Sequence, residues 1–349
     1  MRFQRKNEIP HLDGFRGLLA VWLFWFHVNL FDQNALSSHP ELVNFIKGGP
    51  MGVDGFFAMS GFILVHVYHQ SFDSYKSKFD LLKTYLKFLY FRVARIWPLH
   101  LMMSALWIKP YIFEWRCTKE EFFMEVTFTT PIYQPDRWVG MCNPPSWSII
   151  NEFYAYLSFP FLYFFLTKLN KNNSVIKNIL MIGFVLGVLF LGKGYWHYHL
   201  YHEWKFDHLA YFDINMTIFE FFAGMAFYRI YEKYNRKHWI NDFIVLSLLV
   251  LIVYLNVNYN YMDYYQKYSY IILVFPFFLV KMNSFMAYIF SSDLFKFLGD
   301  ISFSLYLSHV FWLDYFAAKV LYPHNIFQCS NILFIFFRLT QRETFFFRG

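Results

Sequence analysis

Residues 12–28 read LDGFRGLLAVWLFWFHV, an apolar segment interrupted by two ionisable side chains, Arg16 and His27. On a helix, the eleven-residue interval between them is roughly 16 Å along the axis and about three turns, so both side chains lie on nearly the same face. Ionisable groups inside a bilayer are costly and usually mark a pathway or a site. The segment therefore predicts a membrane-spanning helix with a functional site, the arginine near one membrane surface and the histidine deeper.

The composition of the whole chain indicates a membrane protein. Of 349 residues, 57% are hydrophobic, 25% are aromatic and 16% are charged, and the mean hydropathy is +0.29. Soluble globular domains carry about 25% charged residues, so this chain falls outside that class. Its apolar stretches are continuous rather than alternating, which favours transmembrane helices over transmembrane strands.

We predict one membrane domain that fills residues 1–349 and belongs to the all-α class. The chain is polytopic, with about ten spans that each approach the ~20 apolar residues a bilayer requires. These spans cover residues 12–31, 50–69, 96–113, 147–167, 177–192, 210–230, 241–259, 268–282, 297–322 and, most weakly, 326–338.

Basic residues predict how these spans are oriented. Lys and Arg gather in the N-terminal tail and in the even-numbered loops, whereas the third loop is rich in acids. An excess of Lys and Arg marks cytoplasmic loops, so we expect a cytoplasmic N-terminus. The net charge of +7 then lies in short loops beside membrane lipids, and nucleic-acid binding is not expected. No small-residue cleavage site follows the first span, so no cleavable signal is expected either.

Cysteines and loop histidines add few constraints. Cys117 and Cys142 fall in the third loop, where an external location permits a disulfide, although spacing alone does not decide whether it forms. Cys329 would be left unpaired. A histidine cluster in the fifth loop lacks the ligand spacing of known metal sites, so we expect an aromatic interfacial loop and no metal there. The cluster comprises His197, His199, His202 and His208.

His27 and Asp54 are two candidates for catalysis. A neutral imidazole can take a proton from a hydroxyl group, although a hydrogen bond to a neighbouring span would also explain this histidine. Asp13 stands at the start of the same segment. Residues 52–62, GVDGFFAMSGF, place Asp54 near the outer end of the second span. Their glycines suit close helix packing as well as ligand contact, while a functional role is favoured for Asp54.

The segment of residues 83–98, KTYLKFLYFRVARIWP, is basic, aromatic and expected to be cytoplasmic. Its lysines suit contact with anionic lipid. Arg92 and Arg95 are three residues apart on one helix face, directly before a span. Because guanidinium groups bind phosphate in bidentate pairs, the two arginines predict a phosphate-bearing cytosolic ligand.

The fourth and ninth spans carry the remaining candidates. Ser148, Glu152 and Tyr156 follow one another at four-residue spacing and share a helix face. An ionised glutamate in a bilayer needs a partner, which leaves structural pairing and substrate orientation as alternatives. Residues 298–309, LGDISFSLYLSH, place His309 within the ninth span.

Together these segments resemble the acyltransferase-3 family of integral membrane acyltransferases, which includes bacterial O-acetyltransferases of O-antigen and other surface polysaccharides. The resemblance runs in family order from residue 11 to 312. Ile150 departs from the family pattern, which often has a serine there. The similar motifs are basic-x10-His at 16–27, Gly-Val-Asp-x-Phe-Phe-x-x-Ser-Gly-Phe at 52–62, Arg-x-x-Arg at 92–95, Trp-Ser-x-x-x-Glu at 147–152 and Gly-x-x-Ser-Tyr-Ser-Leu-Tyr-Leu-x-His at 299–309.

The resemblance implies a multi-pass enzyme of the bacterial inner membrane. It would take an acetyl group from cytosolic acetyl-CoA and transfer it to a hydroxyl of a cell-envelope glycan, such as O-antigen, capsule or exopolysaccharide, or of a lipid-linked sugar. Acetyl-CoA would be the acyl donor, and no metal is expected.

The resemblance also implies roles for the candidate residues. Arg92 and Arg95 would hold the phosphates of CoA, and Arg16 would extend this grip towards the pantetheine. His27 would deprotonate the acceptor hydroxyl or accept the acyl group itself. Glu152 would orient His27 or an arginine. Asp54 is a further catalytic candidate, and the site lining would include Asp13, Ser148, Tyr156 and His309.

Two alternatives remain at this point. A related enzyme could transfer another acyl group or use another acceptor, such as an amine or a small molecule. A polytopic glycan transporter or flippase would also bury polar residues. It would not need the Arg-x-x-Arg segment beside an intramembrane histidine, and it would often show inverted repeats, which we do not find.

Overall fold

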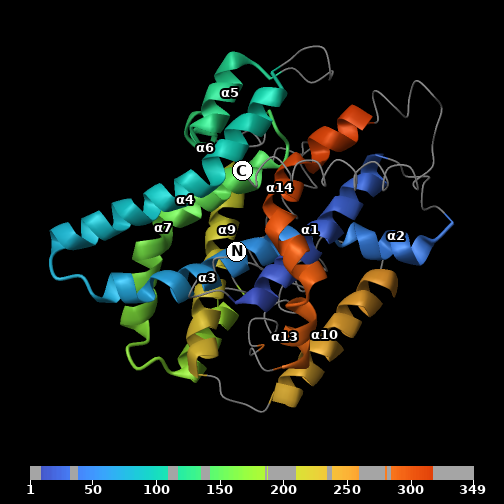
Figure 1. Ribbon diagram of the computed structural model, residues 1–349. Coiled ribbons are helices and arrows are strands. Elements are labelled where there is room, and N and C mark those ends of the chain that lie inside the picture. Colours follow the sequence, from blue (N-terminus) through green and yellow to red (C-terminus); the bar gives the residue numbers. More distant parts are fainter. Residues whose placement is uncertain are drawn as a thin grey trace.

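The computed structural model describes residues 9–31, 38–108, 117–134, 142–184, 187, 210–233, 238–258, 280 and 284–316. Within these ranges every regular element is a helix, which confirms the all-α class (Figure 1). The labelled helices are α1 (Pro10–Phe31), α2 (Pro40–Lys47), α3 (Met51–Asp73), α4 (Lys78–Leu106), α5 (Lys119–Val126), α6 (Thr130–Tyr133), α7 (Ser146–Leu169), α9 (Ala210–Lys233), α10 (His238–Asn258), α13 (Phe285–Phe290) and α14 (Asp293–Phe316). A further helix covers Val175–Phe184.

Six of the predicted spans coincide with long helices, namely α1, α3, α7, α9, α10 and α14. Among the residues that the structure describes, two helical stretches suffice by length and composition to cross a bilayer, Pro40–Asp73 and Ser146–Leu169. The predicted span at 326–338 and nearly all of 268–282 lie outside the described residues. The ten-span topology and the cytoplasmic N-terminus therefore stay predictions.

The second connection, expected between the spans that end at residue 69 and begin at residue 96, is mostly helical. α3 continues to Asp73, and α4 begins at Lys78 and runs through Pro98 to Leu106. Ser77 caps α4 by accepting a hydrogen bond from the Asp80 amide. Lys, Leu and Arg are good helix formers, so the charges that interrupt the apolar pattern do not end the helix. The basic pair Arg92 and Arg95 therefore sits on a rigid element.

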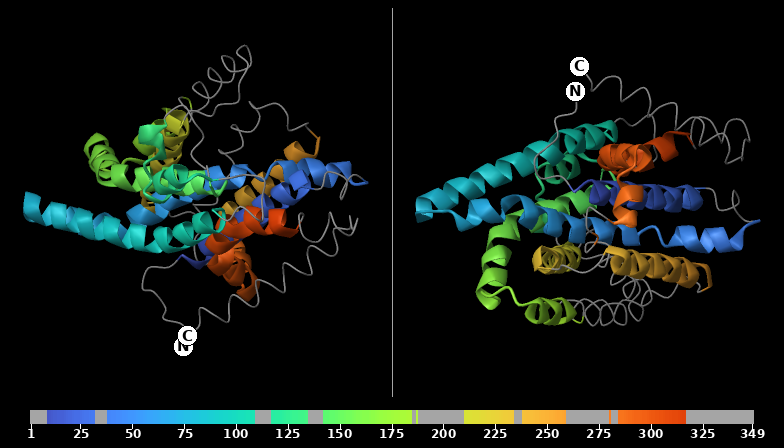
Figure 2. Two further views of the ribbon diagram at one scale, coloured as in Figure 1. Left: turned by 90° about the horizontal axis from the view of Figure 1, so that it is seen from above. Right: turned by 60° about the horizontal axis from the view of Figure 1, so that its bottom comes forward.

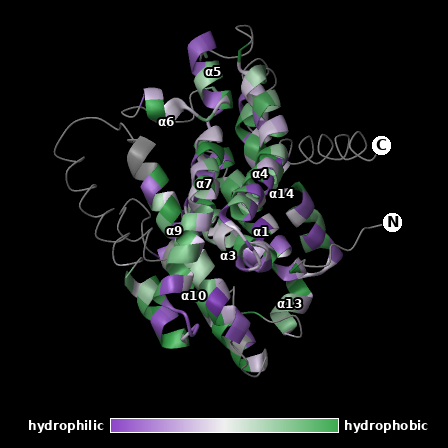
Figure 3. Ribbon diagram, turned by 90° about the vertical axis from the view of Figure 1, so that its left-hand side faces the viewer, coloured by the Kyte–Doolittle hydropathy of each residue, from purple (hydrophilic) through white to green (hydrophobic). Residues whose placement is uncertain are grey.

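Large apolar side chains cover much of the outer surface of the long helices. On α10 they include Trp239, Phe243, Leu246, Val250 and Tyr254, all exposed. Exposed apolar side chains also occur on α4 and α7, and hydrophobic residues run along both helices in Figure 3. Contiguous apolar surface of this extent is unfavourable in water and favourable against lipid acyl chains. The exposed faces of these helices therefore suit a bilayer.

Glycines allow α1 and α14 to touch along their backbones. These helices lie side by side in both views of Figure 2. A Cβ added to Gly299 would collide with the backbone carbonyl of Asp13, and one added to Gly17 would lie 2.5 Å from the Leu298 carbonyl carbon. Only a residue without a Cβ fits such an approach. The two helices are therefore held close enough for short polar side chains to bridge them.

A small cap covers one end of α4 and α7, made by α5 and α6 at the top of Figure 1. The structure pairs Cys117 with Cys142, whose Cα atoms are 5.0 Å apart, so the permitted disulfide is formed. Thr118 and Glu121 form a capping box at the start of α5. The disulfide thus joins the start of α5 to the segment that leads into α7.

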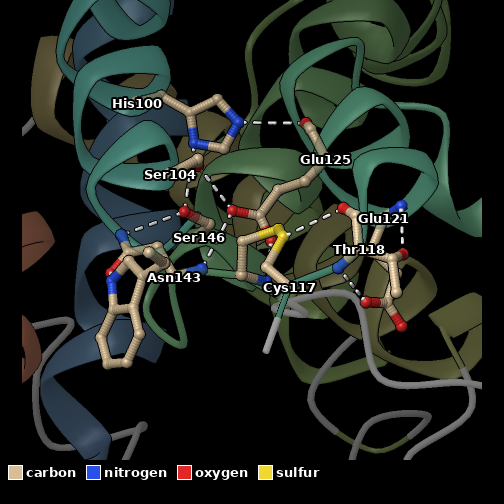
Figure 4. The surroundings of a disulfide bond; sticks show 10 residues. His100, Ser104, Cys117, Thr118, Glu121, Glu125, Asn143 and Ser146 are labelled. Atoms are coloured by element: carbon tan, nitrogen blue, oxygen red, sulfur yellow. Dashed lines mark hydrogen bonds between the residues drawn. A yellow bond between two sulfur atoms is a disulfide. The ribbon is translucent and has the colours of Figure 1, made fainter. Parts of the chain in front are cut away.

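The cap contains a buried carboxylate, Glu125 of α5 (Figure 4). It accepts hydrogen bonds from the Ser104 hydroxyl at 2.6 Å, the Cys142 amide at 2.7 Å and the Asn143 amide at 3.1 Å. Burial raises its pKa to about 7, against the opposing effect of these donors. The carboxylate therefore ties α4 and α5 to the segment before α7.

His100 and Asn143 extend this network towards α14. His100 Nε2 donates to the Glu125 carbonyl at 3.0 Å, and its Nδ1 lies 3.1 Å from the Ser146 hydroxyl at the start of α7. Asn143 Nδ2 donates to Ser146 and to the Leu307 carbonyl of α14, both at 3.1 Å. The cap network therefore fixes the start of α7 against α14.

Candidate active site

Arg16 and His27 both face α14. Arg16 Nε donates to the Ser302 hydroxyl at 2.9 Å, and Nη2 donates to the Gly299 carbonyl at 3.0 Å. One nitrogen of His27, Nδ1, lies 3.1 Å from Nε2 of His309. The predicted common face is confirmed, because both side chains meet the same neighbouring helix. The structure also brings His309, a predicted lining residue, into direct contact with His27.

The Arg16 guanidinium has acidic and basic neighbours. Its Nη2 forms an ion pair with Asp13 at 3.2 Å, and it interacts electrostatically with Glu152, Asp300 and Arg95. The Arg16 side chain keeps 28% of its surface exposed. The ion pair and these neighbouring charges together determine the position of the guanidinium. Asp13, a predicted lining residue, is thereby placed beside Arg16.

The two imidazole rings are packed against each other. Their centroids are 4.5 Å apart and the ring planes make an angle of 69°. His309 is only 1% exposed, whereas His27 is half-buried. His27 is therefore the more accessible member of the pair, and His309 lies behind it.

A second polar group joins α3 to α7 around Glu152. Its Oε1 accepts hydrogen bonds from the Ser60 hydroxyl at 3.0 Å and from the Tyr156 hydroxyl. The predicted common face of Glu152 and Tyr156 is thus confirmed. Sequence reasoning had treated Ser60 only as a small residue for close packing, although its place in the second motif was the signal for a polar role. Ser148 instead donates to the Pro145 carbonyl at 3.1 Å.

Glu152 was predicted to orient either His27 or an arginine. Glu152 interacts electrostatically with Arg16, whereas the polar contacts of His27 within the described chain are with His309 and the Leu23 carbonyl. The contacts therefore support the arginine as the partner of Glu152. The residue beside His27 is His309 and not Glu152.

Arg92 and Arg95 lie close enough to the Glu152 group to interact electrostatically with Tyr156. Arg92 Nη2 donates to the Tyr68 hydroxyl at 3.0 Å, and its guanidinium carbon stands 5.3 Å from the centroid of that ring. Both arginines interact electrostatically with Tyr156, and Arg95 also interacts with Arg16. Arg95 is exposed. The three predicted cofactor-binding arginines are thus brought into one electrostatic neighbourhood, with Tyr68 as a residue that the sequence did not single out.

Asp54 occupies the first turn of α3 and is half-buried. Two residues earlier, Gly52 packs against α1, where an added Cβ would lie 3.0 Å from the Leu19 carbonyl. Leu19 stands between Arg16 and His27 in the chain, so the first turn of α3 meets α1 between the two ends of the site. The catalytic role of Asp54 stays a prediction. The histidine cluster at 197–208 lies outside the described residues.

Comparison with known proteins gives one match. A family profile described as an acyltransferase domain, of the acyltransferase-3 type, matches residues 9–340 of the chain. No curated protein and no solved structure matches it. The matched region contains every candidate residue described above.

Proposed function

Because this chain belongs to the acyltransferase-3 family, we propose that it is an O-acetyltransferase of the bacterial inner membrane that acts on a cell-envelope glycan. Members of this family are membrane proteins, and membership makes the chain an acyltransferase. The proposal adds the donor, acetyl-CoA, and the acceptor, a hydroxyl of a glycan or a lipid-linked sugar.

One observation carries the proposal: the half-buried His27 and the partly exposed Arg16 lie on one face of α1, and both are held by α14. An acyl transfer from a CoA thioester needs a base for the acceptor hydroxyl and cations for the donor phosphates. The face of α1 offers both, separated by about three helical turns. This separation suits a donor that enters from one side and an acceptor that approaches from the other.

The donor end of the site consists of arginines on two helices. The Nε atom of Arg92 is buried and has no hydrogen-bond partner in the described chain, while Nη2 is committed to Tyr68. A buried donor without an acceptor is unfavourable, so an anion that supplies the acceptor would gain binding free energy. Arg95 adds an exposed guanidinium one turn later. Together they fit the phosphate groups of acetyl-CoA.

The acceptor end centres on His27. In the proposed step the imidazole takes the proton of the acceptor hydroxyl, and the oxygen attacks the thioester carbonyl carbon. The new C–O bond forms as the C–S bond breaks, and the CoA thiolate then takes up the proton. If His27 attacks the thioester first, an acetyl-imidazole forms as the CoA thiolate leaves. The acceptor oxygen then displaces the imidazole from the acetyl group, and the hydroxyl proton again ends on the CoA thiolate. Glu152 stabilises the cationic Arg16 throughout, since opposite charges in a low-dielectric site attract strongly.

The test uses purified protein in vesicles with acetyl-CoA labelled in the acetyl group and lipid-linked glycan isolated from the host. Label should appear in the glycan as a base-labile ester, and the His27→Ala variant should lose this transfer while binding acetyl-CoA normally. Glycan that crosses the membrane without gaining label would instead support a flippase. Label trapped on the wild-type protein, and absent from His27→Ala, would select the acetyl-histidine route.

A further inference from the structure

Hydrogen bonds at the two histidines specify where their protons lie. Nδ1 of His309 contacts the backbone carbonyl of Tyr306, three residues earlier in α14. A carbonyl oxygen only accepts, so this Nδ1 must carry a proton. In the neutral ring, Nε2 of His309 is then a bare acceptor, and it is this atom that faces His27.

The same reasoning applies to His27. Its Nδ1 lies 3.1 Å from the Leu23 carbonyl and 3.1 Å from Nε2 of His309. Both neighbours are acceptors, so Nδ1 of His27 is the donor and shares its proton between them. A neutral imidazole has one proton, which leaves Nε2 of His27 with a free lone pair. The donor on one side of the ring thereby determines the basic atom on the other.

We propose that His309 is a positioning residue, which holds His27 in the Nδ1–H tautomer so that Nε2 of His27 takes the acceptor proton. This inference rests on the proposed acyltransferase function. It assigns the reactive atom and gives the buried histidine of the 299–309 motif a role. When His27 becomes charged, the bond from its Nδ1 to His309 becomes charge-assisted and strengthens. The pair therefore stabilises the charged form that arises during the reaction.

The register of α14 supports this role. Ser302, which binds Arg16, and His309 are seven residues apart, which is about two turns and returns to the same helix face. One face of α14 thus holds both ends of the site. The Leu23 carbonyl also contacts Nδ1 of His27, but in the α-helix it already accepts the backbone amide of His27, and it cannot fix α1 relative to α14. His309 supplies the acceptor that orients the ring and joins the two helices.

The experiment compares two substitutions at position 309. His309→Gln can present an amide oxygen close to where Nε2 stands, whereas His309→Phe keeps a planar ring of similar volume without an acceptor. We expect His309→Phe to lower kcat by about 100-fold or more, the scale of a lost general base. KM for acetyl-CoA should stay within about threefold, and His309→Gln should recover most of kcat.

A spectroscopic measurement tests the tautomer separately from activity. Nitrogen-15 NMR of protein labelled at histidine distinguishes a protonated ring nitrogen from a bare one, and His27→Gln identifies the His27 signals. Wild-type His27 should show a protonated Nδ1 and a bare Nε2, and His309→Phe should populate the opposite tautomer. A protonated Nε2 in the wild type, or an unchanged tautomer in His309→Phe, overturns the inference. Absent acetyl transfer by the wild type would overturn the proposed function alone.

Discussion

Arg92 uses only part of its guanidinium within the protein. One terminal nitrogen donates to the Tyr68 hydroxyl, the guanidinium carbon stands 5.3 Å from the centroid of that ring, and Nε is buried with no acceptor among the described residues. An unpaired buried donor costs on the order of 1–3 kcal/mol. The side chain is thus held in position by an aromatic residue while one donor remains for an anion. An arginine that is held by one nitrogen and has another donor available is better suited to ligand binding than to a purely structural ion pair.

We predict that the double substitution Arg92→Ala and Arg95→Ala weakens acetyl-CoA binding by about tenfold or more, because charge-assisted bonds contribute roughly 1.5–3 kcal/mol each. The matched control is Lys83→Ala with Lys87→Ala, which removes two charges from exposed positions on the same helix. Equilibrium dialysis with labelled acetyl-CoA gives both dissociation constants. Equal losses in the two variants would mean that only the general positive charge of α4 matters.

At the scale of single residues, sequence patterns predicted faces well and partners poorly. The common face of Arg16 and His27 follows from helical spacing, as does that of Glu152 and Tyr156. The pairing of His27 with His309 joins residues 282 positions apart, and no local pattern encodes such a contact. Likewise nothing in the residues around Arg92 indicated Tyr68, which lies on another helix.

At the scale of elements, the contact between α1 and α14 depends on residues without side chains. We predict that Gly299→Ala lowers both the melting temperature and the activity, because its Cβ would collide with the backbone of Asp13. Overpacking of this kind costs about 1–3 kcal/mol. Separation of the helices would also stretch the contacts of Arg16 and His27 with α14. Thermal unfolding in detergent, followed by intrinsic tryptophan fluorescence, measures the effect.

The control for this prediction is Gly183→Ala. Gly183 lies in the helix Val175–Phe184, and an added Cβ there would meet no described atom within 4 Å. Alanine is favoured over glycine by roughly 0.5–1 kcal/mol in a helix interior, so this variant should keep or slightly raise the melting temperature. A drop of similar size at both positions would indicate that the close approach of α1 and α14 is not the cause.

The cap formed by α5 should make stability depend on pH. Burial raises the pKa of Glu125 to about 7, from 4.5, so the folded protein binds the proton more tightly than the unfolded chain. The stability contributed by this proton is complete below about pH 4.5 and is lost as pH rises through 7. The loss amounts to about 3 kcal/mol at most, given 1.36 kcal/mol per unit.

Glu125→Gln tests this expectation because glutamine can still accept from Ser104 and does not ionise. We expect the melting temperature of the wild type to fall between pH 5 and 8 more steeply than that of the variant. Parallel curves for the two proteins would show that another group controls the pH dependence. Reduction of the disulfide is avoided in both, so that the cap stays joined through Cys117 and Cys142.

At the scale of the molecule, composition sufficed for the all-α class and the long apolar helices. It did not indicate where α4 begins, because charged residues from Lys78 to Arg95 interrupt the apolar pattern although the helix runs through them. The buried network around Glu125 was also unpredicted. Its members come from α4, α5 and the start of α7, and an acidic loop suggests solvent rather than burial.

The predicted orientation can be tested through the disulfide. With a cytoplasmic N-terminus, the segment that holds Cys117 and Cys142 faces the cell exterior. The experiment uses cells with a permeable outer membrane and an intact inner membrane. A reductant that cannot cross the inner membrane should open the disulfide, and a bulky maleimide that cannot cross it either should then label both thiols. The variant Cys117→Ala with Cys142→Ala supplies the background signal. Labelling that requires disruption of the inner membrane would reverse the orientation.

The contacts between α1 and α14 also determine when the site can exist during synthesis. Arg16 and His27 leave the ribosome early, whereas Ser302 and His309 follow 286 and 282 residues later. At typical synthesis rates this delay is roughly 14–56 s. For that time α1 carries two ionisable side chains whose final partners have not yet been made. A chain that stops before residue 293 would contain His27, the proposed catalytic residue, without the helix that carries His309, so we expect the nascent chain to be inactive until α14 has been made.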